Sequence, residues 1–176
     1  MHATIQTASG RYANLVAPLP HHIDIGDIAH ALSNICRFGG HTREFYSVAQ
    51  HSVLVSRIVP HEHALAALLH DAAEAYVGDV TLPLKQLLPD YRTIEASIWR
   101  AIASSFDLPA DLPACVKRAD LVLLATERRD LMKEQDTPWP VLDGVPPLPA
   151  PIDPWPPSHA RAMFVMRYWD LRKEAA

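Results

Sequence analysis

The stretch LLHDAAEAYVGD, residues 68–79, places three titratable side chains among Leu, Ala, Tyr and Val. These three, His70, Asp71 and Glu74, belong to residue types that are seldom buried without a partner, because removing them from water is costly. On a helix, Glu74 lies at i+4 from His70 and at i+3 from Asp71, so all three reach one side. The spacing indicates a functional cluster. A plainer alternative stays open, in which His70 is a hydrogen-bonded core histidine and the carboxylates face solvent.

Two further residues, His51 and Asp120, interrupt predicted helix faces that otherwise consist of Val, Leu and Ala. With His70 and Asp71 they supply two imidazoles and two carboxylates, the mixed nitrogen and oxygen ligation that suits a six-coordinate divalent cation. Positions left for water and a substrate oxygen are typical of a catalytic metal rather than a structural one. We therefore expect these four residues to bind one divalent metal ion, from the group Co, Mn, Mg, Zn and Fe.

The order of these residues also resembles a known family. His51, then His70-Asp71, then Asp120 is the H…HD…D signature of the HD superfamily of metal-dependent phosphohydrolases. The surrounding segments VAQHSVLVS, ALLHDAAEAYVGDVTLPLK, YRTIEASI and VKRADLVLLATE are similar to the bacterial HD-type 5'-deoxynucleotidases and to phage HD dATP triphosphohydrolases. The resemblance covers roughly residues 35–132. The N-terminal residues and a later proline-rich segment lie outside it.

The resemblance implies an HD-domain helical bundle and a role for each matching position. It implies that the four residues described above are the metal ligands, with Asp71 also taking part in catalysis. Glu74 and Asp79 correspond to acidic residues that the family uses around the attacking water and the sugar end of the substrate, and Glu74 is the second catalytic residue. The implied substrate-binding residues are Arg37 for phosphate, Phe38 for the nucleoside, Asp79 for the sugar, and Lys85 and Lys117 for further phosphates.

Each substrate-binding assignment has a plain structural alternative. Arg37 could instead stabilise the dipole of a preceding helix, and His41 or Arg43 could then take its place at the phosphate. Asp79 follows Gly78 and could be a turn residue that bonds its own backbone. The two lysines could be ordinary surface residues.

The expected reaction is removal of the 5'-phosphate from a nucleotide, with a deoxynucleoside monophosphate as substrate. A divalent metal would polarise the phosphoryl oxygen and lower the pKa of a bound water. Two alternatives stay open: release of triphosphate or pyrophosphate from a dNTP, and a regulatory module that binds metal and nucleotide without turnover. No histidine lies between Asp71 and Asp120, which argues against the two-metal and di-iron members of the superfamily and favours a single metal.

Composition limits the possible partners. The 176 residues are 49% hydrophobic and 20% charged, as in an ordinary globular domain, and carry a net charge of -4. The basic residues are scattered, which argues against a nucleic-acid groove, and no apolar run is long enough to cross a bilayer. The N-terminus lacks the features of an export signal and the chain has only two cysteines, so we expect a cytoplasmic protein. Homologous HD enzymes form dimers or larger rings, which implies self-association.

Helical periodicity dominates from residue 23 onward and predicts an all-α fold in one domain, 1–176, with a core over about 23–132. We find no convincing strand alternation. The predicted helices cover about residues 25–36, 48–58, 61–77, 89–106, 113–132 and 159–174, with a short helical turn within 81–88. The predicted capping residues are Asp24, Ser47 in a capping box with Gln50, Asp90 and Ser158 at helix starts, and Gly39-Gly40 and Gly78 at helix ends.

A proline-rich segment, residues 137–158, precedes the C-terminal helix. It holds nine of the sixteen prolines, which excludes regular helix and sheet and favours an extended loop or arm. Trp139 and Trp155 lie within it. Because exposed tryptophans are unfavourable, we expect them to pack against the body of the protein or against a neighbouring subunit.

Overall fold

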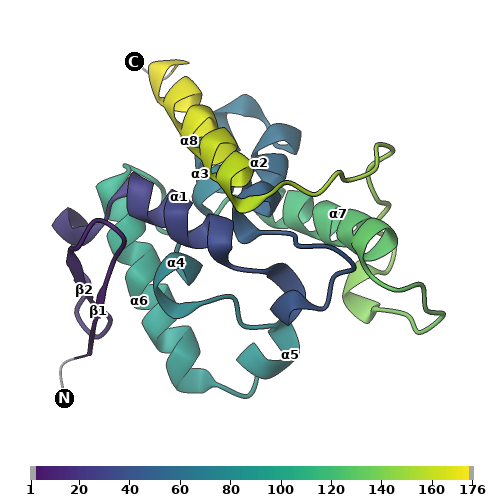
Figure 1. Cartoon of the computed structure of the whole chain (residues 1–176), viewed down its shortest axis with the longest axis horizontal. Helices are drawn as coiled ribbons and strands as arrows, with labels where there is room; N and C mark the ends of the chain where they lie inside the picture. Colours follow the sequence, from purple (N-terminus) through teal and green to yellow (C-terminus); the bar gives the residue numbers. More distant parts are fainter. Residues whose placement is uncertain (1–2, 175–176) are drawn as a thin grey trace.

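The computed structural model describes residues 3–174, and most of these lie in α-helices, as predicted (Figure 1). The helices are α1 (Ile25–Asn34), α2 (Val48–Ile58), α3 (Ala64–Leu69), α4 (Glu74–Val77), α5 (Leu82–Lys85), α6 (Pro89–Ser105), α7 (Ala114–Leu131) and α8 (Pro157–Glu174). Short 3-10 turns are η1 (Pro20–His22), η2 (Arg37–Gly40), η3 (His61–His63) and η4 (Pro140–Leu142). Within the described residues, no helix is both long enough and apolar enough to cross a membrane.

Helix α2 lies at the centre and packs against α1, α3, α7 and α8. It begins as predicted, because the Ser47 side chain accepts a hydrogen bond from Gln50 N at 3.2 Å. The second half of the predicted capping box is absent from this helix start, since the Gln50 side chain bonds the proline-rich segment. Its Nε2 donates to Asp153 O at 2.7 Å, and its Oε1 accepts from Trp155 N at 2.8 Å. Gln50 therefore ties this segment to the central helix.

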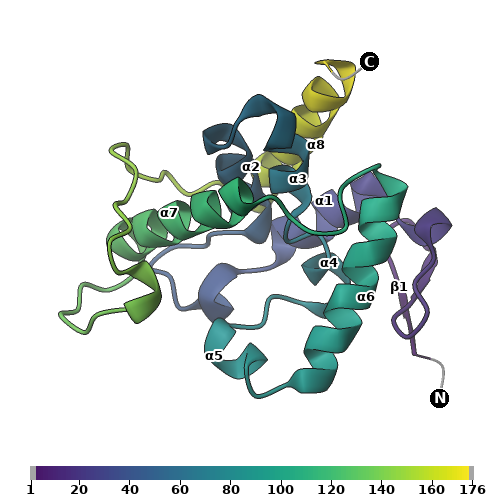
Figure 2. The same ribbon diagram turned by 180° about the vertical axis from the view of Figure 1, so that it is seen from behind.

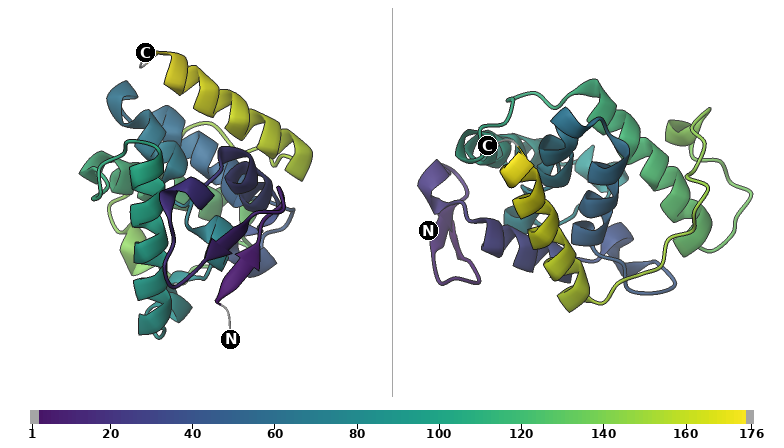
Figure 3. Two further views of the ribbon diagram at one scale, coloured as in Figure 1. Left: turned by 90° about the vertical axis from the view of Figure 1, so that its left-hand side faces the viewer. Right: turned by 90° about the horizontal axis from the view of Figure 1, so that it is seen from above.

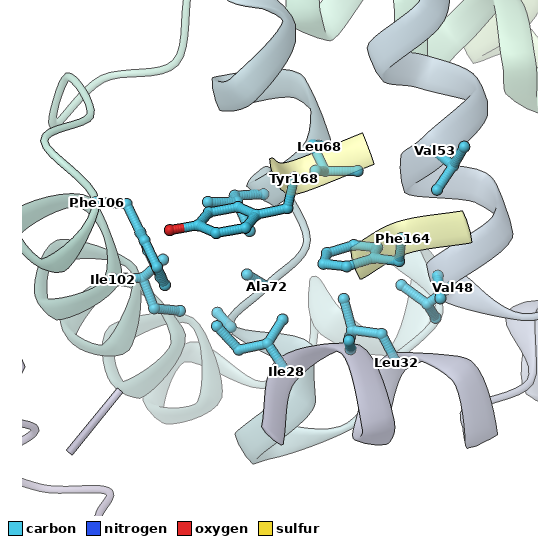
Figure 4. Packing of buried hydrophobic residues seen from close by; sticks show 14 of the residues in the cluster. Ile28, Leu32, Val48, Val53, Leu68, Ala72, Ile102, Phe106, Phe164 and Tyr168 are labelled. Atoms are coloured by element: carbon cyan, nitrogen blue, oxygen red, sulfur yellow. The ribbon is translucent and has the colours of Figure 1, made fainter. Parts of the chain in front are cut away.

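The main core lies beneath α8, which packs against α1, α2 and α3 (Figure 1), and Figure 4 shows the side chains of this core from close by. Phe164 of α8 is fully buried in the same cluster as Leu32 of α1 and Val48 of α2. Tyr168, one turn further along α8, meets Phe106 edge to face, with ring centroids 5.7 Å apart. Burial of this apolar surface is the main term holding α8 onto the body.

A second apolar cluster fixes α7 against α2 and α3, as the view from behind shows (Figure 2). Its buried members are Val55, Ala67, Val116, Ala119 and Leu123. Val55 lies one turn after His51 in α2, and Ala119 directly precedes Asp120 in α7. The packing of small apolar side chains thus brings two residues of the predicted metal site together.

The continuous helix predicted over residues 61–77 is wrong. The chain forms η3, α3 and α4 instead, with a tight turn at residues 70–73 between α3 and α4. Within it Glu74 N donates to Asp71 O at 3.0 Å, a bond to the third residue back that winds the chain more tightly than an α-helix. His70 and Asp71 therefore occupy a turn rather than a regular helix.

The predicted helix starts are confirmed in part. The Asp24 side chain caps α1 by accepting bonds from Gly26 N at 2.8 Å and Asp27 N at 3.2 Å. The predictions for Asp90 and Ser158 are wrong, because α6 and α8 begin at the prolines that precede them. Proline suits the first helical position, since it has no N–H to satisfy and its φ is already helical.

Helix ends also differ in part from the prediction. Helix α1 ends at Asn34 rather than at the Gly39-Gly40 pair, and these glycines belong to η2 with φ values of +59° and +81°. Gly78 ends α4 as predicted, with φ +82°.

The prediction of no strands is wrong for the N-terminal region. Strand β1 (Thr4–Gln6) pairs antiparallel with β2 (Tyr12–Asn14), and this hairpin lies at one side of the molecule (Figure 3). Its turn is anchored because Ser9 N and Ser9 Oγ both donate to the carboxylate of Asp27 at 2.7 Å. Three-residue strands are too short to produce a detectable alternation pattern.

The proline-rich segment has the irregular form predicted for it, apart from η4 and the first residues of α8. Both tryptophans are partly buried and pack on the body. Trp155 packs against the main core, and Trp139 lies 6.1 Å from Phe38, measured between ring centroids.

Candidate metal centre

Three side chains from different elements meet at one point. His51 comes from α2, His70 from the turn before α4, and Asp120 from α7, three elements that lie side by side in Figure 2. His51 Nε2 lies 3.4 Å from His70 Nε2 and 3.2 Å from Asp120 Oδ1. One nitrogen or oxygen from each residue lies within 4.8 Å of the other two. This group could hold a metal ion.

The remaining imidazole nitrogens show how the two rings are oriented. His51 Nδ1 lies 2.6 Å from Glu127 Oε1, and His70 Nδ1 lies 2.8 Å from Ala67 O. A carbonyl only accepts, and the pKa of Glu127 is lowered, so both Nδ1 atoms carry the proton and donate it. If both rings are neutral, neither Nε2 atom carries a proton, so these two nitrogens and the neighbouring carboxylate oxygens are all hydrogen-bond acceptors and repel one another. Only a cation, a proton or a metal ion, relieves this arrangement, and the nitrogen and oxygen donors fit a divalent metal.

Asp71 borders the same point. Its Oδ2 lies 3.1 Å from His70 Nε2 and 3.5 Å from His51 Nε2. Burial acts to raise the pKa of this carboxyl, but the neighbouring imidazoles and Arg37 outweigh burial and hold the pKa far below its usual range. Asp71 is therefore an ionised carboxylate at the edge of the three-residue group.

The two histidines have raised pKa values. Burial and the Arg37 charge act to lower the pKa of His51, but ion pairing with Glu127 and hydrogen bonding to Asp120 outweigh them and raise it to about 9. For His70, burial again acts to lower the pKa, but the charge of Asp71, the hydrogen bond to it and the charge of Asp120 together outweigh burial and raise the pKa. In the absence of metal, the cluster therefore holds protons that a metal ion would have to displace.

Arg37 is mostly buried, with 12% of its side chain exposed, and it lies between two carboxylates. Its Nη2 donates to Glu127 Oε2 at 3.1 Å, and its Nη1 lies 3.6 Å from Asp71 Oδ2. Its Nε is buried with no hydrogen-bond partner among the described residues. The structure thus directs this guanidinium at the cluster rather than at the end of α1. Of the two proposed substitutes, Arg43 donates to Asp130 O at 2.6 Å and His41 is exposed.

Glu74 and Asp79 lie on the α4 side of the cluster, and both have raised pKa values. For Glu74 the cause is burial, followed by the charges of Asp71 and Asp79. Burial also raises the pKa of Asp79, with Asp71 adding to the effect. Glu74 Oε2 is buried and lacks a partner among the described residues. Lys85 Nζ lies 3.9 Å from the other oxygen of Glu74, so the structure brings Lys85 near the site.

The structure brings some of the predicted substrate-binding residues to the cluster but not all of them. Lys85 Nζ lies 2.7 Å from Glu95 Oε1, and this bond raises the Lys85 pKa against the opposing effect of burial. Phe38 lies beside Arg37, whose guanidinium carbon is 5.4 Å from the Phe38 ring centroid. Lys117 is exposed on α7, and no hydrogen bond or ion pair among the described residues joins it to the cluster.

Glu127 is the residue that the sequence analysis missed. It is fully buried, and its two oxygens hold His51 and Arg37. It lies two helical turns after Asp120 on α7, which places both carboxylates on one face. That spacing is the signal that could have identified it. Glu127 is followed by Arg128 and Arg129, and a run of charged residues is typical of a solvent-facing segment.

The fold and the cluster define a class: a predominantly helical protein with a His/Asp group able to bind a metal ion. No family model matches the chain. It is 49% identical to the uncharacterized protein YfdR of Escherichia coli strain K12 over 168 aligned residues. This alignment covers 95% of this chain and 94% of that protein. It is also 40% identical over 121 residues to the uncharacterized protein RCAP_rcc00048 of Rhodobacter capsulatus, covering 63% of this chain and 62% of that protein. The chain belongs to the YfdR family.

Proposed function

We propose that the chain is an HD-superfamily phosphohydrolase that uses a divalent metal ion to remove the 5'-phosphate from a deoxynucleoside monophosphate. The observation that carries this proposal is the convergence of His51, His70 and Asp120 beside Asp71, with the Arg37 guanidinium 3.6 Å from Asp71. Metal ligands and a mostly buried guanidinium at one point suit a phosphate ester, whose oxygens bind both.

In this proposal Asp71 completes the ligand set. When bound, a divalent cation supplies Lewis-acid activation of the phosphate ester and of water. Glu127 fixes the rotamer and the tautomer of His51, and the carbonyl of Ala67 does the same for His70. The residues that hold the cation are thus oriented before it binds.

Arg37 orients the phosphate. Its guanidinium is held by Glu127, and the Nε that has no partner among the described residues can donate to a phosphate oxygen. Arginine offers donors in a fixed plane that matches phosphate, whereas Lys85 supplies only a point charge.

Glu74 moves a proton. Burial and neighbouring carboxylates raise its pKa, so it keeps a proton more readily than a free carboxyl group, and its Oε2 has no partner among the described residues. A carboxyl group with a raised pKa is suited to general acid–base catalysis at an ester oxygen or at the attacking water. Asp79 lies beside it, where the sugar end of a nucleotide would bind.

The test is release of inorganic phosphate from a panel of deoxynucleoside and ribonucleoside monophosphates with Mg, Mn, Co or Zn. We expect metal-dependent release by the wild-type chain and a loss of at least about a hundredfold in Asp71→Ala. Asp170→Ala, which removes an exposed carboxylate from α8, is the matched control and should keep full activity. Equal activity in Asp71→Ala and the wild type would refute the proposal.

The same assay, extended to deoxynucleoside triphosphates and to the release of triphosphate and pyrophosphate, separates the two alternative functions. Triphosphate release from a dNTP would require cations for the extra phosphates, but Lys117 is exposed and Lys85 is bonded to Glu95. This arrangement favours the monophosphate. A non-catalytic binding module would bind metal and nucleotide with no phosphate or triphosphate released under any metal.

A further inference from the structure

Two aromatic residues far apart in the sequence meet beside the metal centre. Phe38 lies in η2, and Trp139 lies in the proline-rich segment just before η4. Their ring centroids are 6.1 Å apart and the ring planes are inclined by 45°. Phe38 directly follows Arg37, whose guanidinium lies 5.4 Å from the Phe38 ring. The aromatic pair therefore lies directly beside Arg37, the proposed phosphate-binding residue.

The backbone of Phe38 is strained. Its φ of +55° and ψ of +29° lie in the left-handed region of backbone conformations, which residues other than glycine rarely adopt. This conformation lets consecutive side chains separate, so that Arg37 contacts Asp71 and Glu127 while Phe38 contacts Trp139. Strain of this kind persists only where the surroundings hold it, and it is concentrated at functional sites.

Trp139 is held in place by α7. The guanidinium carbon of Arg128 lies 5.0 Å from the centroid of the Trp139 ring, within the range of a cation–π contact. Arg128 Nη2 also donates to Thr137 O, two residues before the tryptophan. Glu127, the neighbour of Arg128, holds His51 and Arg37. One turn of α7 therefore positions a metal ligand, the phosphate-binding arginine and Trp139.

We propose that Trp139, with Phe38, forms the surface on which the nucleobase of the substrate stacks, and that Trp139 is a specificity-determining residue. This inference rests on the proposed function. Aromatic side chains stack on any base, because every base has a π-face, and larger purine rings gain more contact. The pair would thus select nucleotides over sugar phosphates that lack a base. If Trp139 only packs the loop, its removal will affect all substrates alike.

The kinetic test compares deoxyadenosine monophosphate with 2-deoxyribose 5-phosphate, which keeps the sugar and the phosphate but has no base. We expect Trp139→Ala to lower kcat/KM for the nucleotide roughly tenfold, mainly through KM, and to leave the sugar phosphate unchanged. Trp139→Phe should restore most of the loss. Trp169→Ala, which removes a half-exposed tryptophan from α8, is the matched control and should alter neither substrate. Equal losses on both substrates, or no loss on either, would overturn the inference.

A binding measurement distinguishes failure of this inference from failure of the proposed function. Calorimetric titration of metal-loaded Glu74→Gln protein with deoxyadenosine monophosphate, with and without Trp139→Ala, does not require turnover. We expect Trp139→Ala to weaken binding roughly tenfold. If the wild type releases no phosphate, the hydrolase proposal fails, and weaker binding in Trp139→Ala still supports the stacking surface. Unchanged binding, or no binding of the nucleotide in either protein, overturns it.

Discussion

Glu127 Oε1 lies 2.6 Å from His51 Nδ1, while the other oxygen of the same carboxylate lies 3.1 Å from Arg37 Nη2. One fully buried carboxylate thus orients an imidazole of the candidate metal centre and neutralises the neighbouring guanidinium. A carboxylate on the far nitrogen of a metal-binding histidine fixes the ring and increases its basicity.

Glu127→Gln should weaken metal binding by about 10- to 100-fold, because the amide is a poorer acceptor for His51 Nδ1–H. Glu127→Ala should also lower the free energy of unfolding by about 3–5 kcal/mol, since it leaves the buried Arg37 charge without this partner. Calorimetric metal titration and denaturant unfolding measure the two effects. Glu62→Gln, at an exposed position in η3, is the control. Wild-type metal affinity in Glu127→Gln would contradict this role.

Metal affinity should rise with pH up to about pH 9. The His51 pKa is raised to about 9 in the metal-free protein, and that of His70 is also raised. A metal ion needs the unprotonated Nε2, so below these pKa values it must displace protons, and affinity falls as pH falls. The pKa values of Asp71 and Asp120 are lowered, so these carboxylates stay ionised over the same range.

Calorimetry in two buffers of different ionisation enthalpy measures the number of protons released. We expect at least partial release of a proton near neutral pH and a steady gain in affinity between about pH 6 and pH 9. Binding that is independent of pH over this range, with no proton release, would show that the two imidazoles are not the ligands.

Gln50 should control the order of the proline-rich segment. Its side chain bonds Asp153 O and Trp155 N, so Gln50→Leu removes both bonds while keeping an apolar stem in α2. We expect faster hydrogen exchange at the Trp155 amide and faster proteolysis within residues 137–156. The free energy of unfolding should fall by about 1–3 kcal/mol, because two backbone groups lose their partners. If the Trp155 amide of Gln50→Leu exchanged at the wild-type rate, the Gln50 side chain would not hold this segment on α2.

Phe164→Ala tests the core beneath α8. Phe164 is fully buried among α1, α2 and α8 residues, so its removal should lower the free energy of unfolding by about 3–5 kcal/mol. Denaturant unfolding of the metal-free protein measures this loss. Met166→Ala, at a position of α8 that is 57% exposed, should change it by less than about 0.5 kcal/mol. Similar losses in the two variants would mean that α8 does not pack as described.

The main features of the site could be predicted because they depend on residue type and spacing. His51 and Asp120 stood out as polar residues on apolar helix faces, and the structure brings both to His70. Both ends of helix α2 were predicted correctly, because each depends on neighbouring residues: Ser47 caps its start, and Pro60 keeps the residue before it out of the helical conformation.

What the sequence did not reveal depends on contacts between distant elements. The turn at residues 70–73 contains two alanines, which are good helix formers, so nothing local indicated that α3 would stop. The structure shows the His70 side chain bonded back to Ala67 O there. Glu127 was not singled out, because its partners, His51 and Arg37, lie far away in the sequence.

The most direct test of the central claim is the anomalous scattering of crystals grown with Mn²⁺. We expect one strong peak about 2.0–2.3 Å from His51 Nε2, His70 Nε2 and a carboxylate oxygen of Asp120, with Asp71 as the fourth protein ligand. A metal ion bound by other residues, or no peak at this point under saturating Mn²⁺, would contradict it.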